Sequence, residues 1–226
     1  MNCFISALIL FVLFSSNSIS LSASELLSED ANNLYDMGKQ SFYTGDLELS
    51  RMYFEQAAEQ NHAEAQYCLG RIYLNGVGVD HDYDMARKWF LLAAEQNHAA
   101  AQRELGEMYF SATGVERNYE KAKEWLLLAA EQNDARAQFL LGVMYDNGYS
   151  VEQDPAKAME LYNLAADQGE ADAQYSLALL YETGTGVKQN MDEAIRLYTL
   201  SYENGNLMAK IKLMELDIQS ENETTP

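Results

Sequence analysis

Few residues of this chain have side chains that commonly bind metals or act as nucleophiles. The 226 residues include three histidines and two cysteines. Cys3 lies in an apolar leader, so the candidates for zinc coordination are Cys68, His62, His81 and His98. A zinc site gathers its ligands around one ion, whereas His62 and His98 occupy equivalent places in successive repeats and His81 is in a turn. We therefore expect no metal site and no bound cofactor.

The other signals for catalysis are equally weak. The chain has no G-x-S-x-G motif that would indicate an activated serine. Its carboxylates recur as equivalents of one another, which is typical of a solvated face rather than of an acid–base pair. These equivalents are Glu59, Glu95, Glu131, Asp167 and Glu203. Cys68 stands where other repeats have Glu104, Leu140 and Ser176, so we interpret it as a spectator thiol. The sequence predicts a protein that is not an enzyme.

The chain is organised by a repeat of 36 residues. The pattern returns over residues 63–98, 99–134, 135–170 and 171–206. In the second copy, Gln102, Leu105, Gly106 and Tyr109 share one helical face by their spacing, and a second helical stretch with Ala122 follows a glycine-rich link. Gly106 in a helix interior costs roughly 1 kcal/mol relative to alanine, so its recurrence predicts that the two helices approach closely.

Polar residues mark the ends of these helices. Asparagine and aspartate are favoured as N-caps, and we expect this role at the start of each second helix. The predicted N-caps are Asp82, Asn118, Asp154 and Asn190. Asparagine and glycine accept the left-handed conformation that often follows a helix. The predicted ends of the second helices are Asn97, Asn133, Gly169 and Gly205.

The N-terminus indicates export. Residues 4–14 are almost wholly apolar, and small polar residues follow to Ser24. This arrangement is typical of a signal peptide, which we place at residues 1–23 with cleavage between Ser20 and Ser24; an uncleaved anchor is the alternative. No later segment has the roughly 18 apolar residues that indicate a membrane span. We expect a periplasmic or secreted protein that does not span a membrane once the leader is removed.

The net charge constrains the choice of partner. The formal charge is -20 at pH 7. An anionic surface repels phosphate backbones, which argues against nucleic acid as a ligand. A partner with a basic face would be attracted instead. Acidic charge that serves only to keep the protein in solution is the simpler interpretation.

The repeat motif resembles the Sel1-like repeat (SLR), a relative of the tetratricopeptide repeat (TPR). The resemblance rests on the Gln102–Tyr109 pattern, Gly114-Val115, Ala122, Trp125 and Ala129-Ala130, recurring four times. It implies an all-α fold, a right-handed α-solenoid of helix-turn-helix repeats. We expect an N-terminal TPR-like unit at 24–62, four repeats over 63–206, a capping helix at 207–218 and a disordered tail at 219–226.

By analogy with TPR proteins, the first helices of such a solenoid line a concave groove. The core positions recur from repeat to repeat whereas the groove positions vary, which is typical of a binding surface. The resemblance implies a partner-binding groove formed by Tyr35, Tyr67, Arg71, Leu74, Arg103, Phe110, Arg136, Phe139 and Tyr175. The alternative is sequence drift on a solvent-exposed face that binds nothing, which would produce the same pattern.

We therefore expect an exported, monomeric, non-catalytic scaffold that binds a segment of a protein or peptide partner. The alternative is a cell-envelope enzyme, because a cysteine-rich SLR branch is associated with β-lactam binding and hydrolysis. That branch carries a disulfide pair in each repeat, and this chain does not. An endoplasmic-reticulum adaptor is disfavoured because the sequence shows no retention signal.

Overall fold

The computed structural model describes residues 30–223, with side chains to residue 217, and this part of the chain is almost entirely helical. The expected all-α architecture is confirmed. The helices of the described residues are α2 (Ala31–Thr44), α3 (Leu47–Glu59), α4 (Ala63–Asn75), α5 (Tyr83–Glu95), α6 (Ala99–Ser111), α7 (Tyr119–Glu131), α8 (Ala135–Asn147), α9 (Pro155–Asp167), α10 (Ala171–Thr183), α11 (Met191–Glu203) and α12 (Leu207–Glu223).

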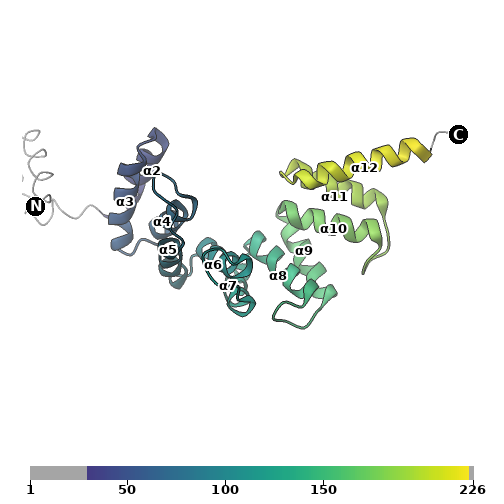
Figure 1. Ribbon diagram of the computed structural model, residues 1–226, viewed down its shortest axis with the longest axis horizontal. Helices are drawn as coiled ribbons and strands as arrows, with labels where there is room; N and C mark the ends of the chain where they lie inside the picture. The colour runs from purple at the N-terminus through teal and green to yellow at the C-terminus, as the bar shows by residue number, and fades with distance from the viewer. Residues whose placement is uncertain (1–29, 224–226) are drawn as a thin grey trace, which may run out of the picture.

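Each helix packs on the helix that follows it, so the fold is a row of five antiparallel pairs with α12 at the end. The pairs follow one another along a curved array, and the two ends of the array lie on the same side of its middle (Figure 1). Such a solenoid has no single central core. Its buried residues instead form layers within and between neighbouring pairs.

A glycine in the first helix of each of the first four pairs lets the second helix come close, as the sequence predicted. A Cβ atom added to Gly106 would lie 2.6 Å from Cγ of Leu126 and 3.4 Å from the carbonyl oxygen of Ala122. The corresponding atom on Gly70 would lie 2.4 Å from the ring of Phe90. The large side chain of the second helix therefore packs directly on the backbone of the first.

The predicted N-caps are confirmed, and the residues predicted as helix ends adopt the left-handed conformation two residues after each second helix ends. Asp82, Asn118, Asp154 and Asn190 each accept a hydrogen bond from the backbone N–H three residues later. Asn97 and Asn133 have φ values of 64° and 67°, in the left-handed region, and Gly169 and Gly205 lie there too. A hydrogen bond from the N–H of His98 to the carbonyl oxygen of Ala93 closes the turn after α5.

Buried glutamines connect successive pairs. Gln102 is 2% exposed, and its side-chain amide donates to the carbonyl oxygen of Ala94 at the end of α5. Its Oε1 accepts from Gln132, just after α7, at 2.7 Å. Equivalent hydrogen bonds are donated by Gln96 to Gln66 and by Gln168 to Gln138. At the last junction, Asn204 is the donor to Gln174. We call this recurring set the glutamine chain.

The ends of the array differ from the expected boundaries. The C-terminal helix α12 runs to Glu223 rather than ending at 218, so five residues of the expected disordered tail are helical. The predicted signal peptide, residues 1–23, lies outside the described residues. Within residues 30–223, no helix has the length and apolar character needed to cross a membrane.

Candidate partner-binding surface

Charged residues of the first helices form a continuous row from one pair to the next. Arg71 of α4 lies 3.6 Å from Glu104 of α6, which also pairs with Arg103 at 3.1 Å. Arg103 pairs with Glu107 at 3.2 Å, and Glu107 lies 3.6 Å from Arg136 of α8. Three of the nine residues predicted for the groove, Arg71, Arg103 and Arg136, thus lie in one row, which we call the ion-pair ladder.

The ladder continues toward the C-terminus through more carboxylates. Arg136 is 2.9 Å from Glu170 and also bonds Asp172 of α10, while Arg103 lies 3.4 Å from Asp134. Three guanidinium groups therefore face five carboxylates, counting Glu104, Glu107, Asp134, Glu170 and Asp172. The arginines that the sequence offered as partner contacts are already paired within the chain, and the row as a whole has an excess of negative charge.

Burial influences the titration of this row. It opposes the charged form of Arg103, but Glu104, Glu107 and Asp134 outweigh this effect and raise the arginine pKa. Burial likewise raises the pKa of Glu104 above its ordinary value, although Arg103 opposes that change. The side chain of Glu104 is 10% exposed, so this carboxylate belongs to the inner layer of the ladder and a partner would meet the others first.

Histidines shape the N-terminal part of the surface in a way that their sequence positions did not reveal. His62 and His98 are N-caps: Nδ1 of each accepts from the backbone N–H three residues later. Their rings stack on Tyr35 and Tyr67, with centroids 4.7 and 4.8 Å apart. Nε2 of His98 lies 2.9 Å from Glu64. The two tyrosines are therefore held in place by the histidine caps.

Other predicted aromatic and apolar residues have different surroundings. Phe110 is partly buried and lies edge-on to Tyr119 and Tyr149, which stack on each other at 4.5 Å. Phe139 is 9% exposed and belongs to the core, with the guanidinium of Arg136 over its ring.

Leu74 and Tyr175 are also partly buried. Leu74 packs on the core layer around α5 and α6, and the ring of Tyr175 lies 5.5 Å from that of Tyr198. Of the apolar and aromatic residues predicted for the groove, Phe139 thus contributes least to the surface.

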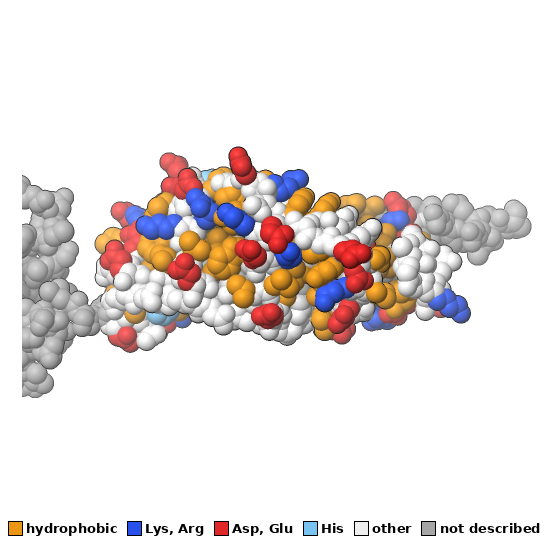
Figure 2. Space-filling model, turned by 90° about the horizontal axis from the view of Figure 1, so that it is seen from below, with side chains coloured by type: hydrophobic (Ala, Val, Ile, Leu, Met, Phe, Trp, Pro, Cys, Tyr) orange, Lys and Arg blue, Asp and Glu red, His pale blue; other side chains and the backbone are white. Residues whose placement is uncertain are grey.

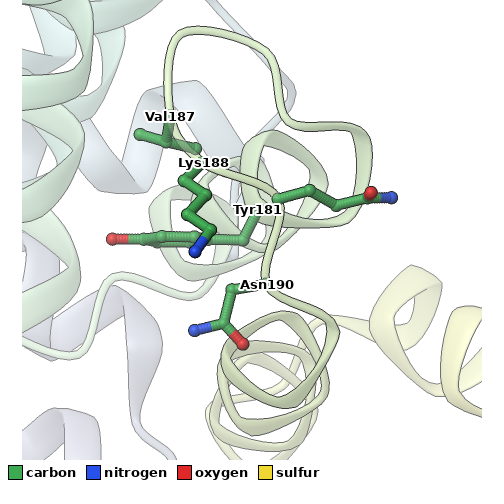
Figure 3. Close-up of a pocket in the computed structure, with 5 residues that line it drawn as sticks. Tyr181, Val187, Lys188 and Asn190 are labelled. Atoms are coloured by element: carbon green, nitrogen blue, oxygen red, sulfur yellow. The ribbon is translucent and has the colours of Figure 1, made fainter.

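An open hollow of about 560 Å³ lies between the end of α10 and the start of α11 (Figure 3). Tyr181, Val187, Lys188, Gln189 and Asn190 line it. Asn190 caps α11, and the Gln189 amide donates to the carbonyl oxygen of Glu182 at 2.8 Å. These polar groups are therefore used in the turn, and the hollow contains no combination of acid, base and nucleophile.

The candidate metal ligands do not gather. Among residues 30–223, no three histidine, cysteine or acidic side chains are arranged to hold an ion. His81 instead contacts the carbonyl oxygen of Leu74 at 2.9 Å, within the linker. Burial raises the pKa of the Cys68 thiol to about 11, which keeps it protonated at neutral pH and poorly reactive.

Oppositely charged groups also meet elsewhere on the surface. On the face in Figure 2, acidic and basic side chains lie beside one another among apolar ones. Isolated exposed ion pairs contribute little to stability. The ladder is distinguished from them by its continuity over four first helices and by its partial burial.

The Sel1 repeat family model matches residues 29–62, 63–98, 99–134, 135–170 and 171–206. The chain therefore belongs to the Sel1 repeat family and is a Sel1-repeat scaffold protein. The first unit, which we expected to be TPR-like, is matched as a Sel1 repeat as well. No curated protein matches the chain at a significant level.

Solved structures with the same fold include a Sel1 repeat protein from Oxalobacter formigenes. It is 33% identical with a TM-score of 0.77, and the match covers 84% of this chain and 79% of that one. A protective antigen of uropathogenic Escherichia coli with an SLR fold is 31% identical with a TM-score of 0.74; the match again covers 84% of this chain but only 42% of the antigen. An immunity protein of Pseudomonas aeruginosa, 22% identical with a TM-score of 0.55, shares the fold.

Proposed function

We propose that this protein is an exported, non-catalytic adaptor that binds an extended or helical segment of a protein partner along the ion-pair ladder. The observation that carries the proposal is the continuity of the ladder across α4, α6, α8 and α10. A row of this kind can contact one segment at several successive points. The core beneath it recurs in every repeat, so the surface can vary without altering the fold.

The charge of the ladder favours a segment that carries lysine or arginine. Its three arginines are outnumbered by five carboxylates, and the whole chain has a formal charge of -20. Charge complementarity of this kind steers encounter and selects the partner more than it adds affinity. Tyr67 and Phe110 supply aromatic surface beside the charges, and aromatic residues are enriched among the contacts that dominate binding energy.

Export is part of the same proposal and rests on the leader at residues 1–23. The similar SLR-fold protein from uropathogenic E. coli is a protective antigen, which supports a location outside the cytoplasm only by analogy. A partner in the periplasm or in the medium is consistent with the leader and with the acidic surface.

Selection from a peptide library would test the proposal. The immobilised protein should enrich peptides rich in lysine and arginine. A variant with Glu107→Gln and Asp172→Asn should bind the selected peptides at least about tenfold more weakly, because attractive charges are removed. The matched control is Glu124→Gln with Glu160→Gln, two exposed carboxylates on the second helices α7 and α9. The adaptor hypothesis fails if no basic peptides are enriched or if the two double variants bind equally.

An enzymatic role needs a separate measurement. Incubation of the purified protein with a chromogenic β-lactam should give no hydrolysis above that of a heat-denatured sample. Hydrolysis that scales with the amount of folded protein would contradict a non-catalytic adaptor.

A further inference from the structure

The last helix has an exposed apolar stripe opposite its buried face. Ala209 of α12 is fully buried against the rest of the array. Leu207, Ile211 and Met214 are 70%, 48% and 58% exposed. Their spacing of four and three residues places them on one side of the helix. Large apolar side chains aligned in this way typically mark a contact surface.

The repeat register explains why this stripe is apolar. Counting from Asn206, α12 is aligned with the first helices of the other units, so that Ala209 corresponds to Ala137 and Met214 to Gly142. In the complete unit, Gly142 lies under Tyr162 of the second helix, α9. The exposed stripe is thus the side of α12 that a second helix covers elsewhere, and none of the helices described for this chain lies on it.

The surface around the stripe protrudes at one end and is hollowed beside its middle. Leu207 and Met208 protrude at the N-terminal end of α12, where Met208 is 55% exposed. An open hollow of about 420 Å³ lies beside the middle of the helix. Its lining residues are Ile195 of α11 with Leu213, Met214, Leu216 and Asp217. The hollow therefore lies between α11 and α12, beside the stripe rather than on it.

The charges beside the stripe fit an antiparallel pairing of two copies of α12. Lys210 and Asp217 are both exposed and are seven residues apart, so they lie on the same flank of α12 two turns from each other. A two-fold axis across two antiparallel helices brings a flank against its own copy. With the axis crossing α12 midway between these two residues, Lys210 of one chain faces Asp217 of the second copy, and the reverse pair forms on the other side of the axis.

We propose that the exposed stripe of α12 is a homodimer interface in which two copies pair as antiparallel helices about a two-fold axis. The proposal replaces the monomer that we expected from the sequence. It does not depend on the ion-pair ladder, whose residues all lie outside α12. The particle would present two ion-pair ladders, so that a partner with two binding segments could gain affinity through bivalency.

Sedimentation equilibrium over a range of protein concentrations tests the interface. The wild-type protein should approach the mass of two chains as its concentration rises, whereas Ile211→Glu should remain monomeric. Leu207→Glu is a second variant with the same expected result, and an acidic residue at the start of a helix is compatible with folding. The matched control, Leu128→Glu, alters an exposed leucine on α7 and should leave dimerisation unchanged. Circular dichroism shows which variants are folded.

Charge reversal tests the antiparallel arrangement. Lys210→Glu alone and Asp217→Lys alone should each weaken the dimer, and the double variant should restore most of the wild-type association constant. The interface is wrong if the wild-type protein is monomeric at every concentration, or if folded Ile211→Glu and Leu207→Glu variants still dimerise. A dimer that Ile211→Glu disrupts but that the double charge variant does not restore would overturn the antiparallel pairing.

Discussion

The side chain of Gln132 donates a hydrogen bond of 2.7 Å to Oε1 of Gln102, and the amide of Gln102 donates to the carbonyl oxygen of Ala94 at 3.2 Å. One glutamine therefore connects α5, α6 and the residue that follows α7. The surrounding interface consists of alanine and larger apolar side chains, so these polar bonds specify how one helix pair is placed on the next.

Replacing Gln102 with leucine should destabilise the fold. The change removes the hydrogen bonds that Gln102 makes with Ala94, Asn97 and Gln132 across a largely buried interface, and each such bond contributes about 0.5–1.5 kcal/mol net. Urea unfolding followed by circular dichroism measures the loss. Gln56→Leu, at an exposed position of α3, should change the free energy of unfolding by less than about 0.5 kcal/mol. Equal losses in the two variants would mean that the glutamine chain has no special role.

Gly106→Ala should lower stability although alanine is the better helix former. The added Cβ would lie 2.6 Å from Cγ of Leu126, and overpacking of this kind costs about 1–3 kcal/mol. Thermal unfolding provides the comparison. Combining the change with Leu126→Ala should cost less than the sum of the two single changes, because the smaller side chain provides space. A more stable single variant would show that the close approach of the two helices is not required.

Cys68 should react slowly with alkylating reagents in the folded protein. Burial raises the pKa of its thiol to about 11, so the reactive thiolate is scarce at pH 8. We expect modification to be at least about a hundredfold slower than in denaturant, where a cysteine pKa is about 8.5. The measurement is best made in a Cys3→Ser background, so that one thiol is observed. Equal rates in the folded and denatured states would contradict a buried, unreactive thiol.

The buried carboxylate of Glu104 should make part of the stability pH-dependent. Its pKa is raised in the folded state by burial, so the folded protein holds this proton more tightly than the unfolded chain does. The resulting stabilisation is present below the ordinary glutamate pKa of about 4.3 and is lost as the pH rises through the raised value. Relative to Glu104→Gln, the wild-type protein should therefore gain stability on acidification from neutral pH. Parallel stability curves for the two proteins would exclude this effect.

Expression of the full chain in an exporting host tests the leader. We expect intact-mass measurement of the exported protein to show cleavage between Ser20 and Ser24. Leu10→Asp should block export, because it places a charge within the apolar segment. Recovery of the full-length chain in the membrane fraction would favour the uncleaved anchor instead.

Much of the fold could be predicted because its determinants are local or periodic. The recurring Gly106 and Leu105 positions define the core face of each first helix, and Asn118 and Asn133 mark the start and end of a second helix through short-range hydrogen bonds. These features depend on a few neighbouring residues. They therefore follow from spacing alone, without knowledge of how the pairs stack.

The candidate surface was less predictable because its contacts join different repeats. The sequence placed Arg136 on the groove but could not show that Glu170 and Asp172 pair with it. It also could not show that His98 is an N-cap stacked on Tyr67. Such contacts depend on the register between one first helix and the next. Histidine is an uncommon N-cap, so no local pattern identified it.

The glutamine chain has a consequence for how this protein can evolve. Three of the four junctions use the same glutamine donor and acceptor atoms, so a unit such as residues 99–134 can be deleted or duplicated as a 36-residue cassette. Removing it would bring Gln138 to the end of α5, where Gln102 now bonds Ala94. Unequal recombination between the repeats could therefore lengthen or shorten the array by whole 36-residue units. The new neighbours would meet through the same kind of interface.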